Sequence, residues 1–183
     1  MTAKMIIRVL GLAFVVIVST GSWNPAVASP AGNPPAATAN PYLCEGEFYS
    51  QKLNGTYSTP AYDYKPTASN QNTIHIGSNS ANIHYGVGDT VLYAINFSRG
   101  YTAAQLQIRY AAAAPGNIIN VYLDGAFRGT ITTQNTGGWG SFAWHPTIIA
   151  LGNIGTGTHV VSFMVTTGGS YGMNLDVFKI TGL

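Results

Sequence analysis

The chain has 183 residues, of which only 8% are charged, far below the roughly 25% usual in soluble domains. Eight lysines and arginines against six aspartates and glutamates give a formal net charge of +2, an excess too small to indicate a nucleic-acid partner. The single cysteine, Cys44, excludes an intrachain disulfide, so the fold has to rest on an apolar core. We expect Cys44 to be a buried thiol or to form an occasional bridge between chains.

The first 28 residues predict an export signal. Lys4 and Arg8 flank the start of an apolar run, Val9–Val18, and Ala26-Val27-Ala28 then supplies small residues at the spacing that a signal peptidase reads. The run is too short for a transmembrane helix, which needs about 20 residues. We therefore expect a signal peptide at residues 1–28 and a secreted, extracellular mature protein with no membrane contact after cleavage. Without the two basic residues of the signal, that mature chain is formally neutral.

Residues 29–42 read SPAGNPPAATANPY, a composition rich in proline and alanine that is typical of a linker. The folded domain is expected at residues 43–183, which is close to the usual size of one domain. We expect it to be a monomer.

Beyond this linker the hydrophobic pattern has a period of two. Apolar or aromatic residues occupy every second position of Val91–Phe97 and Ala104–Tyr110, which predicts strands with one buried face. Further strands are predicted at Glu45–Tyr49, Thr73–Ile76, Asn82–Tyr85, Ile118–Leu123, Phe127–Thr132, Thr147–Leu151, His159–Thr166 and Asn174–Ile180. Turn signals such as Asp124-Gly125 separate them. The expected fold class is all-β, a two-sheet β-sandwich.

One stretch, Gly168–Gly172 (GGSYG), matches the G-x-S-x-G motif of hydrolases. That motif requires a helix after the serine and a histidine later in the chain, whereas here a strand pattern follows and no histidine lies beyond Ser170. We interpret the stretch as a hairpin turn. The four histidines lack metal-binding spacing and are expected at the surface or in loops: His75, His84, His145 and His159.

Aromatic residues near turns are the main candidates for binding. Trp139 follows two glycines, where a large indole is difficult to bury, and Tyr85 ends a short predicted strand. Exposed rings of this kind stack on the apolar faces of sugar rings, and a nearby amide such as Asn174 can bind sugar hydroxyls. The alternative is that aromatics belong to the core, which we expect for Tyr93, Phe97, Tyr110, Phe142 and Phe163.

Three carboxylates form a candidate metal site. Glu45 and Glu47 lie two residues apart on the first predicted strand, so their side chains should share one face. Asp176 interrupts the apolar pattern of the last strand, and first and last strands often lie side by side in sandwiches. The three can form an oxygen-ligand calcium site. The alternatives are exposed edge charges or a glycosidase pair drawn from the six carboxylates of the chain.

The ordered motifs resemble those of family 6 carbohydrate-binding modules. The matching segments are 44–47 (CEGE) for E-A-E, 88–93 (GDTVLY) for G-D-aromatic-V-x-Y, 107–111 (QIRYA) for L-x-x-R-Y-A, 121–125 (VYLDG) for v-x-v-D-G, 136–139 (TGGW) for T-G-G-W, 157–161 (GTHVV) for G-x-H-t-v and 174–176 (NLD) for N-x-D. The resemblance implies a jelly roll of the galactose-binding-domain-like type that binds β-linked polysaccharide such as xylan or β-glucan. It places the family's loop-end sugar site on Trp139, Tyr85 and Asn174, and its structural calcium on Glu45, Glu47 and Asp176.

The chain departs from the family pattern at a few positions. Thr90 replaces the usual aromatic residue after G-D, Phe142 replaces a common second tryptophan, and a one-residue gap makes His84 an alternative to Tyr85. The sequence therefore predicts a secreted carbohydrate-binding module that is not an enzyme. The alternatives are a secreted polysaccharide hydrolase that uses carboxylates on the sandwich face, and a structural or adhesion domain without sugar binding.

Overall fold

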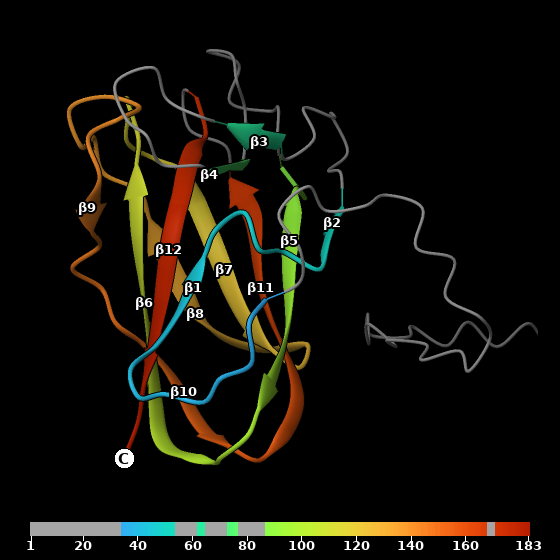
Figure 1. The fold of residues 1–183 in the computed structure, drawn as a ribbon. Coiled ribbons are helices and arrows are strands. Elements are labelled where there is room, and N and C mark those ends of the chain that lie inside the picture. The colour runs from blue at the N-terminus through green and yellow to red at the C-terminus, as the bar shows by residue number, and fades with distance from the viewer. Residues whose placement is uncertain (1–33, 54–61, 65–72, 77–86, 168–170) are drawn as a thin grey trace, which may run out of the picture.

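The computed structural model describes residues 34–53, 62–64, 73–76, 87–167 and 171–183, which form twelve strands and no helix (Figure 1). One sheet contains β1 (Tyr42–Glu45), β3 (Tyr62–Tyr64), β4 (Thr73–Ile76), β6 (Tyr101–Ala111), β9 (Ala143–Trp144), β10 (Ile149–Ile154) and β12 (Met173–Thr181). The other contains β2 (Gln51–Leu53), β5 (Thr90–Phe97), β7 (Ile118–Leu123), β8 (Ala126–Thr132) and β11 (Gly157–Thr167). Within these ranges nothing is helical and apolar over the length that crossing a bilayer requires.

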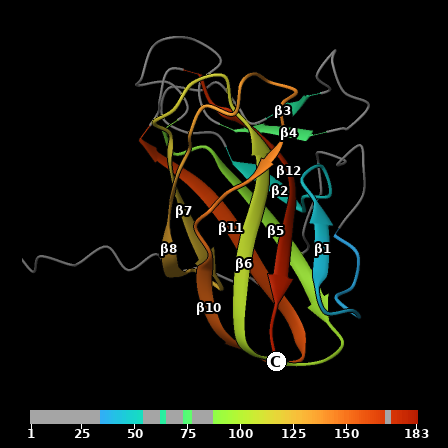
Figure 2. The same ribbon diagram turned by 90° about the vertical axis from the view of Figure 1, so that its left-hand side faces the viewer.

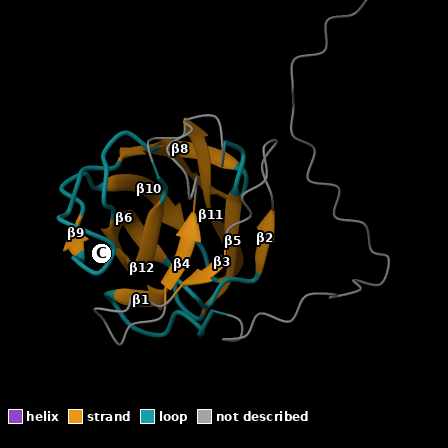
Figure 3. Cartoon of the chain, turned by 90° about the horizontal axis from the view of Figure 1, so that it is seen from above, coloured by secondary structure: helices purple, strands orange, loops and turns teal. Residues whose placement is uncertain are grey.

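The two sheets are antiparallel and pack face to face, as the turned view and the view from above show (Figures 2 and 3). The seven-stranded sheet has the order β10-β6-β12-β4-β3, with β1 on β12 and β9 on β6; the five-stranded sheet has the order β2-β5-β11-β7-β8. The prediction of an all-β, two-sheet sandwich is confirmed. The first and last strands also lie side by side, as predicted: β1 pairs with β12, with Glu45 opposite Val177.

The core lies between the sheets and is filled by alternating side chains of both. The rings of Tyr93, Phe163 and Phe178 meet edge to face at centroid distances of 4.8–5.8 Å, an arrangement that favours aromatic packing. Four of the five aromatics predicted in the core are buried. The prediction for Phe142 is wrong, because its half-buried ring lies under the guanidinium of Arg109 instead of between the sheets.

The predicted first strand, Glu45–Tyr49, shares only Glu45 with β1, which both begins and ends earlier. The backbone N–H of Gly46 donates to the carbonyl of Asp176, and that of Phe48 donates back to the carbonyl of Glu45 at 3.1 Å, so the chain turns immediately after β1. Glu45 and Glu47 therefore do not share the face of one strand. A Cβ on Gly46 would lie 2.2 Å from the carbonyl oxygen of Leu175, so a glycine allows this close approach.

Short strands account for the other differences. Strands β2, β3 and β9 each have two or three residues, too few to give a hydrophobic period. Strand β10 begins at Ile149 instead of Thr147. The predicted strand Asn82–Tyr85 and the GGSYG serine, Ser170, lie outside the described residues.

Residues 34–41, which belong to the predicted linker, pack against the sandwich and are called the N-terminal strap below. Ala37 is fully buried and forms a parallel bridge with Phe97 at the end of β5. The hydroxyl of Tyr101 donates to the strap backbone, and the side chain of Asn40 bonds both the N–H and the carbonyl of Gly182. The strap thus ties the start of the described chain to its C-terminal end, at the bottom of the sandwich in Figure 1.

Candidate functional site

Trp139 lies in the loop of residues 133–142, which joins β8 to β9 at the upper end of the sandwich in Figure 1. Gly137 and Gly138 have φ values of +99° and +142°, a region that side chains other than glycine rarely adopt. The side chain of Asn135 accepts the N–H of Gly137 at 2.8 Å, and the N–H of Ser141 donates to the carbonyl of Gly138 at 3.2 Å. The loop therefore turns sharply and leaves the indole half-buried at its tip.

The loop is fastened to the end of β6 by several hydrogen bonds. The hydroxyl of Tyr110 accepts the N–H of Gln134 at 2.9 Å, and the N–H of Thr136 donates to the carbonyl of Ala112 at 2.9 Å. In return the Thr136 hydroxyl accepts the N–H of Ala112 at 2.9 Å. Burial raises the pKa of Tyr110, so its hydroxyl stays neutral in this role. The base of the loop is consequently fixed on a strand of the core.

His145 holds the other side of the same loop. Its Nδ1 accepts the N–H of Thr147 at 3.0 Å, so Nε2 carries the hydrogen that is donated to the carbonyl of Thr132 at 2.9 Å. The ring is buried, and so is that of His75. The prediction of a surface or loop position is wrong for His75, which lies buried on β4 with its Nδ1 bonded to the amide of Asn174. His145 does lie in a loop, between β9 and β10, but its ring is buried because backbone groups satisfy both ring nitrogens.

Asn174 is fully buried at the start of β12, directly beneath the Trp139 loop. Its Oδ1 accepts a hydrogen bond from Nδ1 of His75 at 2.8 Å, and its Nδ2 donates to the carbonyl of Trp139 at 2.9 Å. The amide thus joins β12, β4 and the loop. The structure brings Trp139 and Asn174 together and gives Asn174 a positioning role, whereas Tyr85 lies outside the described residues.

Two further rings flank the indole of Trp139. The His75 ring lies 5.4 Å away between centroids, and the Tyr171 ring stands at 88° to the indole at 6.2 Å. Tyr171 is 39% exposed, and its carbonyl accepts Nδ2 of Asn117 at 2.9 Å. Sequence reasoning missed both residues. The sequence offered only weak signals for them: Tyr171 lies three residues before Asn174, and His75 lies in the predicted strand Thr73–Ile76.

We call His75, Trp139, Tyr171 and Asn174 the indole site. It offers aromatic surface above a buried amide and carries no carboxylate or amine of its own. Aromatic surface with a few oriented polar groups suits a neutral ligand with apolar faces and hydroxyls. These four residues supply neither a carboxylate pair nor an activated nucleophile, which hydrolysis of a glycosidic bond would require.

Of the three candidate metal ligands, Asp176 is the most buried, with a side chain that is 1% exposed. Its Oδ2 forms an ion pair with Nη1 of Arg109, while its Oδ1 is buried and accepts no hydrogen bond from a described residue. Burial raises the pKa of Asp176 against the opposing effect of Arg109. Partial burial of its carboxyl group, followed by the charge of Asp176, raises the pKa of Glu45, although the residue as a whole is exposed.

Carboxylate oxygens suit a hard cation such as calcium. The oxygen best placed to coordinate such an ion is Oδ1 of Asp176, which accepts no hydrogen bond from a described residue. The carboxylates are only partly gathered, because Glu45 is exposed at the end of β1 and Glu47 follows the turn. Among the described residues, no three histidine, cysteine, aspartate or glutamate side chains lie together as a ready metal cage.

An antiparallel sandwich with aromatic rings held on its end loops defines a β-sandwich binding module. The family model described as carbohydrate binding module (family 6) matches residues 54–182. The chain therefore belongs to the family 6 carbohydrate-binding modules, and the resemblance found in its sequence is confirmed.

Solved structures of this family share the fold. A β-1,3-glucan binding module from Bacillus halodurans is 20% identical, covers 82% of this chain and 99% of its own, and has a TM-score of 0.57. A module from Clostridium cellulolyticum in complex with xylose is 22% identical, with coverage of 78% and 96% and a TM-score of 0.57. A Clostridium stercorarium module in complex with cellobiose is 19% identical, with coverage of 83% and 98% and a TM-score of 0.56. No match was found among curated proteins.

Proposed function

We propose that this chain is a secreted, non-catalytic module that binds β-linked polysaccharide such as xylan or β-glucan at the indole site. Membership of the family supports carbohydrate binding. The observation that supports the location is the amide of Asn174, which holds the half-buried indole of Trp139 between the rings of His75 and Tyr171. The exposed parts of these rings would stack on sugar faces, while neighbouring polar groups select hydroxyl orientation.

The choice of β-linked glycans rests on relatives. The Bacillus halodurans module is a β-1,3-glucan binding protein, and the Clostridium stercorarium module was solved with cellobiose. The absence of formal charge on Trp139, Tyr171 and Asn174 is consistent with such neutral polymers.

Substitution of Trp139 by alanine tests the site. We expect Trp139→Ala to lower affinity for insoluble xylan or β-glucan by about fivefold or more, as loss of a central aromatic contact does in other interfaces. Phe127→Ala is the matched control, because Phe127 is an aromatic residue that is 56% exposed on β8 of the other sheet. Unchanged retention of Trp139→Ala would refute the location, and release of reducing sugars by the parent protein would refute the non-catalytic role.

We also propose that calcium binds at Asp176, Glu45 and Glu47 and stabilises the fold. Calcium would neutralise the charge of Asp176, which together with the larger effect of burial raises the pKa of Glu45, and it would be coordinated by the buried Asp176 Oδ1. At a calcium concentration 100 times its Kd, linkage predicts a stabilisation of about 2.7 kcal/mol. Thermal melts in calcium and in chelator measure this difference, with Asp176→Asn as the variant that should lose it. Equal melting temperatures in both conditions would refute the calcium site.

Secretion is tested separately by sequencing the N-terminus of the exported protein. Cleavage after Ala28 would leave Ser29 as the first residue. Recovery of an intact Met1 terminus in the medium, or retention of all the protein in the cell, would refute this part of the proposal.

A further inference from the structure

The outer face of the seven-stranded sheet carries a second group of aromatic and cationic side chains, separate from the indole site. We propose that this face binds the acidic sugars of a polysaccharide, namely uronic acid units, through Trp144 and Lys179. The ring of Trp144 would take the apolar face of the sugar, and the ammonium of Lys179 would take its carboxylate. We call these two residues with Gln107 between them the Trp144 face.

Strand register places the three side chains on the same side of the sheet. Lys179 on β12 pairs with Gln107 on β6, and Arg109, two residues further along β6, pairs with Trp144 on β9. Alternate residues of a strand point to the same side of the sheet, so Gln107 and Arg109 share one face. Their paired residues, Lys179 and Trp144, lie on that face too. Nζ of Lys179 lies 4.7 Å from the centroid of the Trp144 ring, so the two side chains meet above β6.

The indole is exposed and its support is rigid. Trp144 is 41% exposed, and Nε2 of Gln107 donates at 2.8 Å to the carbonyl of His145, the next residue in the chain. The N–H of His145 also donates to the carbonyl of Ile108 on β6 at 2.9 Å. The backbone that carries the indole is therefore held to β6 by two hydrogen bonds at the residue that follows it, so the ring is presented on a fixed base.

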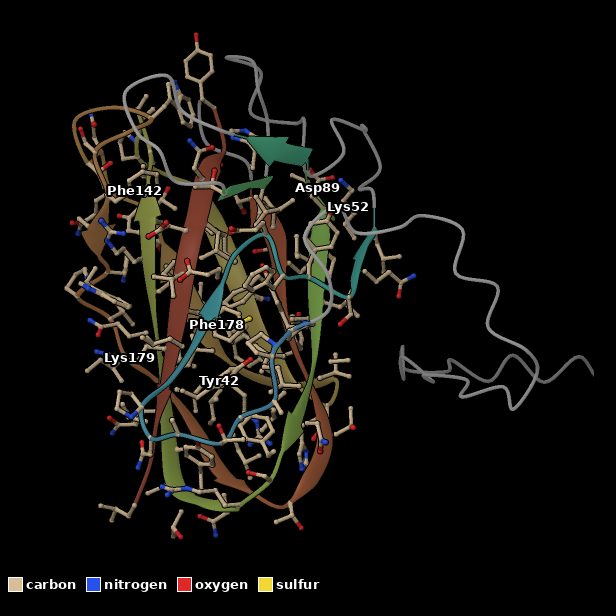
Figure 4. The ribbon with its side chains drawn as sticks, in the orientation of Figure 1. Tyr42, Lys52, Asp89, Phe142, Phe178 and Lys179 are labelled. Atoms are coloured by element: carbon tan, nitrogen blue, oxygen red, sulfur yellow. The ribbon has the colours of Figure 1, made fainter. Side chains whose placement is uncertain are left out.

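The two cations of this face are not equivalent. Arg109 is occupied, because it forms an ion pair with Asp176 and lies 5.3 Å from the Phe142 ring centroid. Lys179 forms no ion pair with any carboxylate that the structure describes, and its ammonium instead lies over the Trp144 ring. Figure 4 shows Lys179 and Phe142 on the same side of the molecule, towards the lower and upper ends of the sheet. Lys179 is thus the cation available to a ligand.

A uronic acid uses this pair of side chains better than a neutral sugar does. A cation over a ring at an exposed site changes an equilibrium constant by only about two- to fivefold, so Lys179 can leave the indole at little cost. The ammonium then meets the carboxylate while the freed ring surface accepts the sugar face. A second copy of the chain is a poorer occupant, because the polar side chains of Lys179, Gln107 and Glu45 interrupt the apolar surface around Trp144.

Binding of the full chain to polygalacturonate, compared with neutral xylan, tests the proposal. We expect Trp144→Ala to lower affinity for polygalacturonate by about fivefold or more. Lys179→Gln should lower it about two- to fivefold and flatten its dependence on salt, as loss of an exposed charge contact does. Neither variant should change binding to neutral xylan, and Phe127→Ala, which removes an exposed ring with no cation over it, should change neither.

Trp139→Ala separates this proposal from the previous one. It should weaken binding to xylan and leave binding to polygalacturonate unchanged, even if the indole site proves to bind another glycan. The Trp144 face is refuted if the parent protein does not bind polygalacturonate, or if Trp144→Ala and Lys179→Gln bind it as the parent does. Equal competition by polyglutamate would also overturn it, because the face would then recognise charge without the sugar. Melting temperatures of each variant exclude loss of folding as the cause.

Discussion

Removal of the Asn174 side chain should destabilise the fold and disable the indole site together. In Asn174→Ala, the carbonyl of Trp139 loses its donor and Nδ1–H of His75 loses its acceptor. A typical hydrogen bond contributes about 0.5–1.5 kcal/mol net, and a buried donor left without a partner costs about 1–3 kcal/mol. His75 is buried, so its N–H cannot regain water, whereas the half-exposed loop can partly rehydrate. The expected loss of unfolding free energy is about 2–4 kcal/mol.

Urea unfolding at 25 °C measures this loss. The urea concentration at the unfolding midpoint should fall, while the slope of the unfolding free energy against urea concentration stays constant. Trp139→Ala is the comparison, since truncation of a half-buried ring at a loop tip should cost much less stability while it weakens glycan binding as much or more. If Asn174→Ala unfolds within about 0.5 kcal/mol of the parent, as a surface substitution would, the amide does not hold the loop. Full glycan affinity in that variant would equally refute its positioning role.

Three other predictions follow from the packing. Gly172→Ala should be strongly destabilising, because its Cβ would lie 2.1 Å from a backbone oxygen of β4, whereas the control Gly155→Ala meets nothing closer than 3.9 Å. Burial raises the pKa of Cys44 to about 12, so the thiol should react with a disulfide reagent at pH 8 only as fast as the protein opens. Glu45→Gln should raise stability at pH 7 in chelator, because burial and Asp176 raise the pKa of the Glu45 carboxyl.

The sign of the last effect follows from linkage. A carboxyl with a folded pKa above its unfolded value stabilises the fold when protonated, so stability should rise as pH falls from neutral towards the ordinary carboxyl pKa of about 4.3. The difference between Glu45→Gln and the parent should shrink over that range, and saturating calcium should reverse it at neutral pH. A stability difference that does not change with pH would contradict the attribution to the Glu45 carboxyl.

Rapid modification of Cys44 in the native protein would contradict the prediction for the thiol. Equal melting temperatures of Gly172→Ala and Gly155→Ala would contradict the prediction for Gly172.

Long strands with regular alternation were predictable from sequence. The segments Val91–Phe97 and Ala104–Tyr110 carry the buried side chains of the two sheets, and both lie within observed strands, because period-two burial is a local property of the chain. Strands such as β9 have no such local signal, since they form only where β6 offers free backbone groups. The early end of β1 depended on a contact between Gly46 and β12 that is distant in sequence.

The indole site was predictable in part for the same reason. Two glycines before Trp139 indicate a turn that exposes the ring, and this is a local property. The burial of His75 and the perpendicular ring of Tyr171 depend on strand pairing, which composition and spacing do not encode. The pairing of Trp144 with Lys179 could not be predicted for the same reason, because the two residues lie far apart in the sequence and are brought together only where β9 and β12 both pair with β6.

The N-terminal strap also fixes the orientation in which the module can meet a polymer. The strap reaches the lower end of the sandwich at Asn40, which bonds Gly182, so the C-terminus is held at that end while the loop of residues 133–142 lies at the other (Figure 1). A partner fused through the C-terminus would therefore lie behind the sandwich and leave the loop end unobstructed. A tether at that end would present the indole site end-on to the proposed glycan, with the Trp144 face turned to the side.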